Sequence, residues 1–221
     1  MEIIKKLRKV PLFLIGQYNL RILKVSHQRK NMERARSKWE MIRANLPENP
    51  GTVLDIGCNE GLFTRNAAKD GWFAWGFDLL ENAIDYAVKI ARKEGQNNVF
   101  FSVGEITPEN VKKFPKFDVI FLLSIFQEIC SKFGMESGYE IFDDILKICN
   151  DRLFFEPSSI NRKYCKGERV FAVDNDFESI NNWVGQLVSR SKSWNFRYIG
   201  KTAYTDNEPY RFMFLIEKKK K

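Results

Sequence analysis

The stretch TVLDIGCNEG at residues 52–61, together with GWFAWGFDLL at residues 71–80, decides the fold of this 221-residue chain. The first stretch is a short apolar run that closes on Gly57, which is typical of a buried strand followed by a sharp turn. The second is a similar run ending at Asp78, about 20 residues after Gly57, with room for a helix in between. This order and spacing predict a nucleotide-binding βαβ unit.

The rest of the chain continues the alternation of strands and helices. Apolar runs and amphipathic segments can be told apart by the period of their apolar positions. We expect strands at residues 52–57, 72–78, 98–103, 117–124, 152–156, 194–200 and 210–217, and helices at 61–70, 81–94, 136–150 and 177–188. This series predicts an α/β fold with a doubly wound, mostly parallel seven-stranded sheet. Because no helix separates the final two strands, the last strand should be antiparallel.

Three regions of the chain differ in composition. We expect a basic helical N-terminal extension over 1–49, an α/β domain over 50–217 and a lysine tail over 218–221. Residues 1–43 hold 12 lysines and arginines against 3 acids, whereas acids outnumber bases between the two ends. Basic ends favour an anionic partner such as RNA or a lipid surface, but solvated helix faces and a solubilising tail explain the same pattern.

The extension reads as two helical segments. Residues 1–15 place apolar and basic residues at helical spacing, a pattern suited to the surface of an anionic membrane. In the second segment one face is apolar and the other basic. The apolar face holds Met32, Ala35, Trp39, Ile42 and Leu46, and the basic face holds Arg34, Arg36, Lys38 and Arg43.

Cysteine usage and hydropathy bear on the compartment. Cys58, Cys130, Cys149 and Cys165 form no CxxC pair and fit no zinc template, so we expect free thiols and no metal. The start of the chain does not resemble a signal peptide, and no run approaches the roughly 20 apolar residues of a membrane span. We therefore expect a cytoplasmic protein, or one peripheral to a membrane.

The loop after the first strand defines the ligand class. Ligands of open parallel sheets bind beyond the carboxyl ends of the strands, where Gly57 lets the backbone turn and Gly61 lets the next helix pack closely. Asn59 occupies the position where GxGxxG has its middle glycine, against which a pyrophosphate lies, so NAD and FAD are disfavoured. Asp78 is placed to accept the ribose hydroxyls of a nucleoside, although it would also serve as a helix cap.

Four stretches in this order resemble the class I S-adenosylmethionine-dependent methyltransferases. They are VLDIGCNEG at 53–61, GFD at 76–78, VGEI at 103–106 and FDVIFLLSIFQE at 117–128. The resemblance covers roughly residues 50–217, which would make this region a methyltransferase domain with S-adenosylmethionine as cofactor. The antiparallel closing strand is also as in that family.

The resemblance implies a role for each residue of the cofactor site. Asp78 would hold the ribose, and Gly57 would lie under the methionine part. Glu105 and Ile106 would bracket the adenine, although Glu105 replaces the usual aspartate and could be a surface residue or a cap. The whole expected set is Asp55, Gly57, Asn59, Gly61, Asp78, Leu79, Glu105, Ile106, Ser124 and Phe126, with Ser124 and Phe126 near the sulfonium and Asp55 orienting the loop.

Candidate catalytic residues are few. The chain's one histidine, His27, lies in the extension, and the loop after the fourth strand has Gln127 and Glu128 where many relatives of the family carry a histidine. If the acceptor must lose a proton, Glu128 and Glu156 are the candidate bases, and both could equally be structural hydrogen-bond acceptors. Gln127, Arg162 and Tyr164 are expected to contact the substrate.

The sequence leaves three classes of methyl acceptor possible. The acceptor is a small molecule or the sugar of a glycan precursor, or RNA gripped by the basic ends, or a lipid-linked group reached from an anionic membrane through residues 1–15. A binding module that keeps the cofactor site without turnover is a further alternative.

Overall fold

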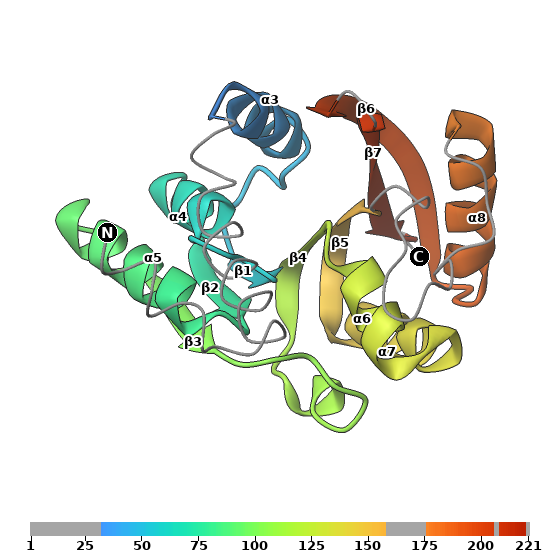
Figure 1. Ribbon diagram of the computed structural model, residues 1–221, viewed down its shortest axis with the longest axis horizontal. Coiled ribbons are helices and arrows are strands. Elements are labelled where there is room, and N and C mark those ends of the chain that lie inside the picture. The colour runs from blue at the N-terminus through green and yellow to red at the C-terminus, as the bar shows by residue number, and fades with distance from the viewer. Residues whose placement is uncertain (1–31, 158–175, 206–207, 220–221) are drawn as a thin grey trace, which may run out of the picture.

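The computed structural model of the chain describes residues 32–157, 176–205 and 208–219 (Figure 1). The predictions for residues 1–15, His27, Arg162, Tyr164 and Cys165 fall outside these ranges. The helices are α3 (Met32–Arg43), α4 (Leu62–Lys69), α5 (Glu81–Lys93), α6 (Phe126–Phe133), α7 (Met135–Ile148) and α8 (Phe177–Ser189), with a 3-10 turn η2 (Val111–Lys113). The strands are β1 (Thr52–Ile56), β2 (Phe73–Asp78), β3 (Val99–Val103), β4 (Phe117–Leu123), β5 (Cys149–Glu156), β6 (Trp194–Thr205) and β7 (Glu208–Lys218).

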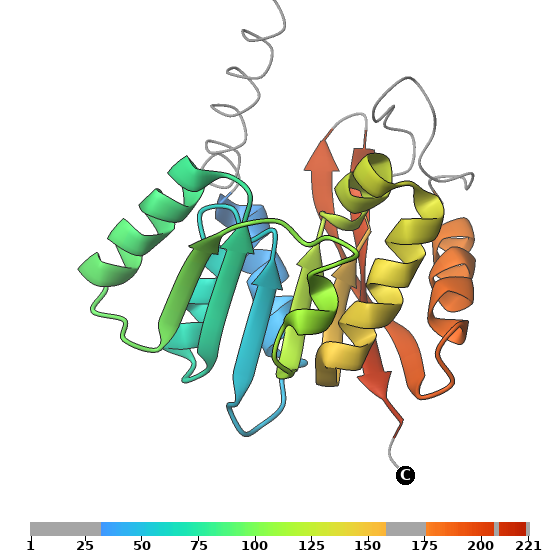
Figure 2. The ribbon, with the colours of Figure 1, turned by 90° about the horizontal axis from the view of Figure 1, so that it is seen from below.

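The described strands form one seven-stranded sheet in the order β3-β2-β1-β4-β5-β7-β6. β1 pairs in parallel with both β2 and β4, and β7 pairs antiparallel with both β5 and β6. The strand order reverses between β1 and β4, which is where ligands bind in such sheets. Figure 2 shows β1, β2, β3 and β4 ending at one edge, with β7 running the other way. The predicted fold class is confirmed.

Two helical layers cover the sheet, and the alternation of side chains along β4 explains both. Ile120 and Leu122 pack in the larger core with residues of α6, α7 and α8. Val119 and Phe121 point the other way, into a core shared with α3 and α4. All four are fully buried. A strand that is apolar on both faces must be central, as the sequence predicted for this segment.

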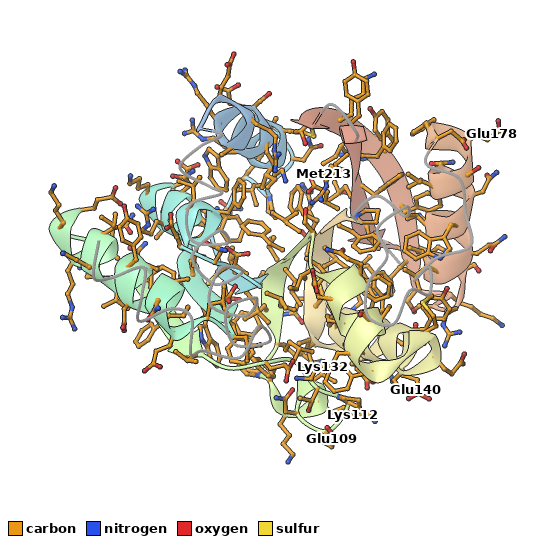
Figure 3. The ribbon with its side chains drawn as sticks, viewed as in Figure 1. Glu109, Lys112, Lys132, Glu140, Glu178 and Met213 are labelled. Atoms are coloured by element: carbon orange, nitrogen blue, oxygen red, sulfur yellow. The ribbon has the colours of Figure 1, made fainter. Side chains whose placement is uncertain are left out.

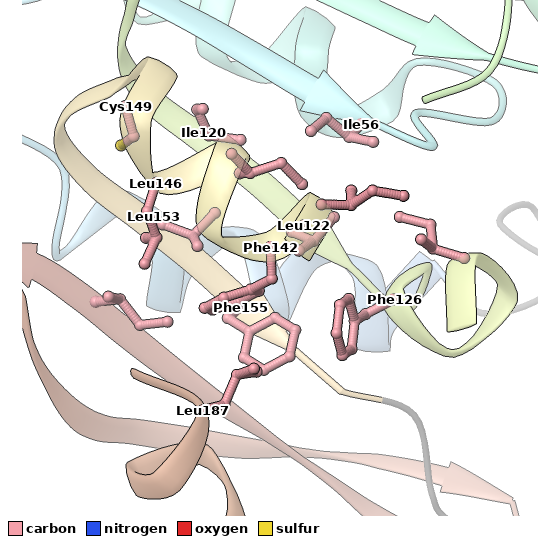
Figure 4. Packing of buried hydrophobic residues seen from close by; sticks show 14 of the residues in the cluster. Ile56, Ile120, Leu122, Phe126, Phe142, Leu146, Cys149, Leu153, Phe155 and Leu187 are labelled. Atoms are coloured by element: carbon pink, nitrogen blue, oxygen red, sulfur yellow. The ribbon is translucent and has the colours of Figure 1, made fainter. Parts of the chain in front are cut away.

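The main correction to the predicted elements is α6. The segment after β4 was expected to be a loop, but Phe126 begins a helix and lies fully buried among the aromatic residues of the larger core. Its ring centroid lies 5.6 Å from those of both Phe142 and Phe155 (Figure 4).

The two largest differences in element boundaries are at β6 and β5. β6 continues beyond Gly200 to Thr205, because the pairing with β7 shifts register between Tyr198 and Gly200 and then resumes. A glycine can thus mark a bulge rather than the end of a strand. Cys149, expected on a helix, is the buried first residue of β5.

The predicted second helix of the extension is present as α3. Ile42 is fully buried in the core beneath the helix, which also packs against β6. In the ranges that the structure describes, none of the helices has the length and apolarity needed to span a bilayer.

Candidate cofactor and acceptor site

A cavity of about 750 Å³ opens at the carboxyl ends of the parallel strands. Its walls come from the segments that follow β1, β2, β3 and β4, from α6, from one side of α3 and from one residue of β7. The predicted residues that border it are Asp55, Gly57, Asn59, Asp78, Leu79, Glu105, Ile106, Ser124, Gln127 and Glu128. Segments distant in sequence therefore meet at the edge that the βαβ pattern indicated.

The loop after β1 turns through left-handed backbone. Gly57 has φ 75°, and its N–H donates to the carbonyl of Phe77 at 2.7 Å. A Cβ at this position would lie 2.9 Å from the side chain of Ile125, so only glycine fits without a shift of the opposite cavity wall. Asn59 follows with φ 51°, a conformation that asparagine tolerates better than most residues.

Gly61 supports the loop from behind rather than bordering the cavity. It has φ 69° and caps the start of α4, and an added Cβ would meet the ring of Phe101 at 2.4 Å. The predicted close packing at the start of the helix is present, and Gly61 is not among the residues that border the cavity.

Asp78 ties the end of β2 to the loop of β1. Its Oδ2 accepts the backbone N–H of Asn59 and its Oδ1 accepts that of Leu80, both at 2.8 Å. Leu80 directly precedes α5, so the alternative reading as a cap describes part of what Asp78 does. A carboxylate has about four acceptor positions, so each oxygen keeps capacity for a ligand hydroxyl.

Asp55 lies deeper in the same wall and is 2% exposed. Burial raises its pKa to about 7, even though the hydroxyl of Thr64 donates to its Oδ2 at 2.6 Å and favours the charged form. The nearby Asp78 raises the pKa further. A buried carboxyl that titrates near neutrality next to a cavity is typical of a functional site.

The segment after β3 supplies a charged rim. Lys132 of α6, labelled in Figure 3, places its Nζ 2.6 Å from the Glu105 carboxylate. Ile106 beside it is 3% exposed. Gly104 precedes them, and a Cβ there would lie 2.5 Å from the ring of Phe77. The segment after β3 thus offers the charged Glu105 and the apolar Ile106 to the cavity.

The segment after β4 forms the opposite wall. Ser124 has φ 60°, and its N–H donates to the backbone carbonyl of Glu156 at 2.8 Å. Gln127 donates from Nε2 to the carbonyl of Ser124 at 2.6 Å, while its buried Oε1 has no hydrogen-bond partner among the described residues. Glu128, in the first turn of α6, also borders the cavity.

Glu156 lies behind this wall. It is fully buried, accepts the Ser124 hydroxyl and pairs with Lys38 at 2.7 Å and Arg211 at 3.9 Å. Burial alone would raise its pKa, but Lys38 and Arg211 outweigh burial and hold the pKa below its usual value. Glu156 does not border the cavity, where a base would have to lie, and it fits the alternative role of a structural hydrogen-bond acceptor.

Phe126, like Gly61 and Glu156, is a predicted residue that does not border the cavity. It was expected near the sulfonium, but it begins α6 with its side chain in the core and makes no part of the cavity wall. Ile125, one position earlier, borders the cavity instead.

The structure adds four cations that the sequence did not single out for the site. Arg34 and Lys38 come from α3, Lys132 from α6 and Arg211 from β7. Arg34 and Lys38 are four residues apart, so they share a helix face, but their charge indicated solvent rather than a cavity. Arg211 lies in a segment whose sequence predicted a strand but gave no indication of a binding role.

Comparisons with known proteins agree with this geometry. A family model described as a methyltransferase domain matches residues 48–164. Ubiquinone biosynthesis O-methyltransferases from two strains of Rickettsia bellii, OSU 85-389 and RML369-C, are each 26% identical over 110 residues. The match takes in 50% of this chain and 42% of the relative, so the chain matches less than half the length of these curated relatives.

Solved structures share the fold at low identity. The plantazolicin methyltransferase BamL superposes with a TM-score of 0.64 at 15% identity, covering 92% of this chain and 91% of BamL. The bifunctional kinase-methyltransferase WbdD gives 0.63 at 19%, covering 86% and 39%. Magnesium protoporphyrin IX methyltransferase from Synechocystis PCC 6803 gives 0.55 at 18%, covering 88% and 81%.

Proposed function

This chain belongs to the S-adenosylmethionine-dependent methyltransferases, and on that premise we propose that it methylates a hydroxyl of a small molecule or of a glycan-precursor sugar. S-adenosylmethionine is the cofactor. One observation carries the proposal: Gly57, Asp78 and Ser124, from three different strand ends, border a single cavity. Its volume of about 750 Å³ lies within the roughly 300–1,000 Å³ of small-molecule sites.

The residues present fit the cofactor. The Asp78 carboxylate has acceptor capacity to spare for two ribose hydroxyls. A Cβ at position 57 would clash with Ile125, and a Cβ at position 104 would clash with Phe77. Glycine at both positions therefore keeps these two walls of the cavity in place. We assign Asp78 to the ribose, Glu105, Ile106 and Leu79 to the adenine end, and the backbone of 57–59 to the methionine part. Asp55 would orient that loop, and Gly61 would support it by packing.

The chemistry divides between the cofactor and the chain. When bound, S-adenosylmethionine supplies an electrophilic methyl group on a sulfonium. The chain's contribution is to align the acceptor, which is worth roughly 7–11 kcal/mol for a well-oriented pair. We assign that alignment to Ser124 and Gln127. Both residues border the cavity, and the Gln127 Nε2 donates to the Ser124 carbonyl, which ties them together.

We assign the general base to Glu128 rather than Glu156. A base must come within hydrogen-bond reach of the proton it removes, and Glu128 borders the cavity whereas Glu156 does not. Glu156 would act as a positioning residue instead. It accepts the Ser124 hydroxyl and fixes the ammonium of Lys38, and so it holds two groups of the cavity wall in place.

The name of the curated relatives supports a hydroxyl acceptor, because they are O-methyltransferases. RNA held by the basic ends and a lipid-linked acceptor reached through residues 1–15 are the alternatives, together with a binding module without turnover. The division into an extension over 1–49, a methyltransferase domain over 50–217 and a lysine tail over 218–221 is part of this proposal. Arg162 and Tyr164 remain proposed substrate contacts.

Transfer of label identifies the acceptor. The full chain is incubated with methyl-labelled S-adenosylmethionine and cell extract separated into small-molecule, lipid and RNA fractions, with the Asp78→Ala variant as the inactive control. Label in the small-molecule fraction supports the proposal. Label confined to RNA or lipid identifies one of the alternatives, and no transfer by a chain that binds the cofactor supports the binding module.

A further inference from the structure

A cluster of cations lines the end of the cavity that faces α3 and β7. The residues that α3 and β7 contribute to the wall are Arg34, Ala35, Lys38 and Arg211. The acids of the wall, Asp55, Asp78, Glu105 and Glu128, come from the ends of β1 and β2, from the segment after β3 and from α6. The cavity thus has a basic end and an acidic side.

Two of the cations of this end, Lys38 and Arg211, are largely withdrawn from water. The Lys38 side chain is 6% exposed and that of Arg211 is 3% exposed. Burial lowers the pKa of Lys38, and the charges of Arg34 and Arg211 lower it further, whereas Glu156 opposes the shift. Glu156 is the acid whose ion pairs join Lys38 to Arg211.

Holding such groups together out of water is costly. Each buried ion loses several kcal/mol of solvation, and neighbouring like charges repel. Lys38 and Arg211 share the carboxylate of Glu156, and Arg34 adds a positive charge close enough to Lys38 to lower its pKa. An anion bound in the cavity would offset the repulsion through charge-assisted hydrogen bonds, for which arginine is suited because its donors match a carboxylate or a phosphate.

The position of Arg211 points to the acceptor rather than the nucleoside. β7 lies in the half of the sheet away from Asp78, with β1, β4 and β5 between β2 and β7. Four strand spacings of about 4.8 Å each separate β2 from β7, so Arg211 lies well away from Asp78. Through Glu156 the cluster joins Ser124, the residue assigned above to aligning the acceptor.

We propose that Arg34, Lys38 and Arg211 bind an anionic group of the methyl acceptor, a carboxylate or a phosphate, next to the atom that is methylated. This inference rests on the proposed function, because it takes the same cavity as the methyl-transfer site. It narrows the substrate class from small molecules in general to acids or phosphate esters.

The experiment uses the full chain saturated with S-adenosylhomocysteine. The carboxylate of this ligand then occupies its own binding site, and an added anion can bind only elsewhere in the cavity. Inorganic phosphate is titrated and followed by phosphorus NMR, and benzoate is titrated in parallel and followed by saturation transfer. Sodium chloride at matched ionic strength controls for screening. Saturable binding of either probe supports the proposal, and the stronger of the two identifies the anion class.

Three variants locate the binding. Arg211→Gln and Arg34→Gln should each weaken the anion about tenfold or more, as expected for the loss of a charge-assisted bond. Lys93→Gln, which removes an exposed cation of α5 that does not border the cavity, should leave anion binding unchanged. Arg34 is only partly buried, so its variant decides the matter if Arg211→Gln fails to fold.

Two results would overturn the proposal. One is a chain loaded with S-adenosylhomocysteine that binds neither anion saturably. The other is a loss of S-adenosylhomocysteine affinity in the Arg211 and Arg34 variants as large as their loss of anion affinity, since the cations would then serve the carboxylate of the cofactor. A wild-type chain that does not bind S-adenosylhomocysteine refutes the proposed function itself, which is a separate outcome.

Discussion

The Oδ2 of Asp78 accepts the backbone N–H of Asn59 at 2.8 Å, so a side chain at the end of β2 fixes the loop that follows β1. Asn59 is in left-handed backbone, and this bond helps to hold it there. The acid and the glycine-rich loop, which the sequence singled out separately, are thus one unit. A substitution at Asp78 removes a ligand contact and releases the loop at the same time.

Gly57→Ala should destabilise the chain more than Gly95→Ala. Both glycines have positive φ, so each alanine introduces strain of about 1–2 kcal/mol. Only at position 57 would the added Cβ also clash, with Ile125 at 2.9 Å, because nothing lies within 4 Å of a Cβ at position 95. Urea unfolding measures both, and calorimetry should find weaker S-adenosylhomocysteine binding for Gly57→Ala alone. Equal losses of stability would show that the wall at Ile125 yields freely.

Asp55→Asn should change the pH dependence of stability. The carboxyl titrates near 3.8 in the unfolded chain and at about 7 when folded, so between these values the folded state holds more protons. The contribution of Asp55 is therefore fully present below the unfolded pKa and is lost as pH rises to about 7. Asparagine does not titrate. The stability of the variant relative to wild type should rise from pH 5 to pH 7 and then level off; a constant difference in urea unfolding from pH 5 to pH 8 would contradict this.

The buried pair of Lys38 and Glu156 should show strong coupling. Glu156→Gln or Lys38→Met alone leaves a buried charge with fewer partners, which costs about 3–5 kcal/mol. The double variant should lose clearly less than the sum of the two. Because the pKa of Glu156 is lowered, its contribution should fade as pH falls below the ordinary glutamate value of roughly 4.3.

A double-mutant cycle in urea measures this coupling. The exposed pair of Arg36 and Glu40, with side chains 82% and 63% exposed, is the control and should contribute about 0.5 kcal/mol or less. Additive losses at Lys38 and Glu156 would mean that the two groups do not depend on each other.

Glu128→Gln should reduce turnover without affecting cofactor affinity. Loss of a general base lowers kcat by about 10²–10⁴-fold. The control is Glu140→Gln, which removes an exposed acid of α7 that points away from the protein (Figure 3) and should leave activity unchanged. Label transfer to the active fraction gives kcat, and calorimetry gives the Kd for S-adenosylhomocysteine. Wild-type turnover in Glu128→Gln would remove the assigned base.

Most of the sheet could be predicted because each strand is a local pattern. The apolar runs around Val53 and Ile120 are short and end at turn residues, and α5 shows a clear helical period that stops at Gly95. Asp78 and Gly57 could be singled out as site residues for the same reason, because each is recognised by its position at the end of a particular strand. These features needed no knowledge of distant contacts.

The failures come from contacts across the fold. Lys38 reads as one of several cations on a polar helix face, and only its pairing with Glu156, 118 residues away, shows that it is buried. The segment from Phe126 to Phe133 has apolar residues at helical spacing, but its eight residues are too few to tell a helix from a loop. Once α6 forms, Phe126 turns into the core.

The measurement that most directly tests the central claim is calorimetric titration of the wild-type chain, Asp78→Ala and Asp85→Ala with S-adenosylhomocysteine. Asp85 is an exposed acid of α5, so its variant controls for the loss of charge. We expect saturable binding to wild type and Asp85→Ala, and binding weakened at least about tenfold in Asp78→Ala, since it loses charge-assisted hydrogen bonds. Undiminished affinity in Asp78→Ala, or no binding to the wild-type chain, would contradict the assignment of this cavity to the cofactor.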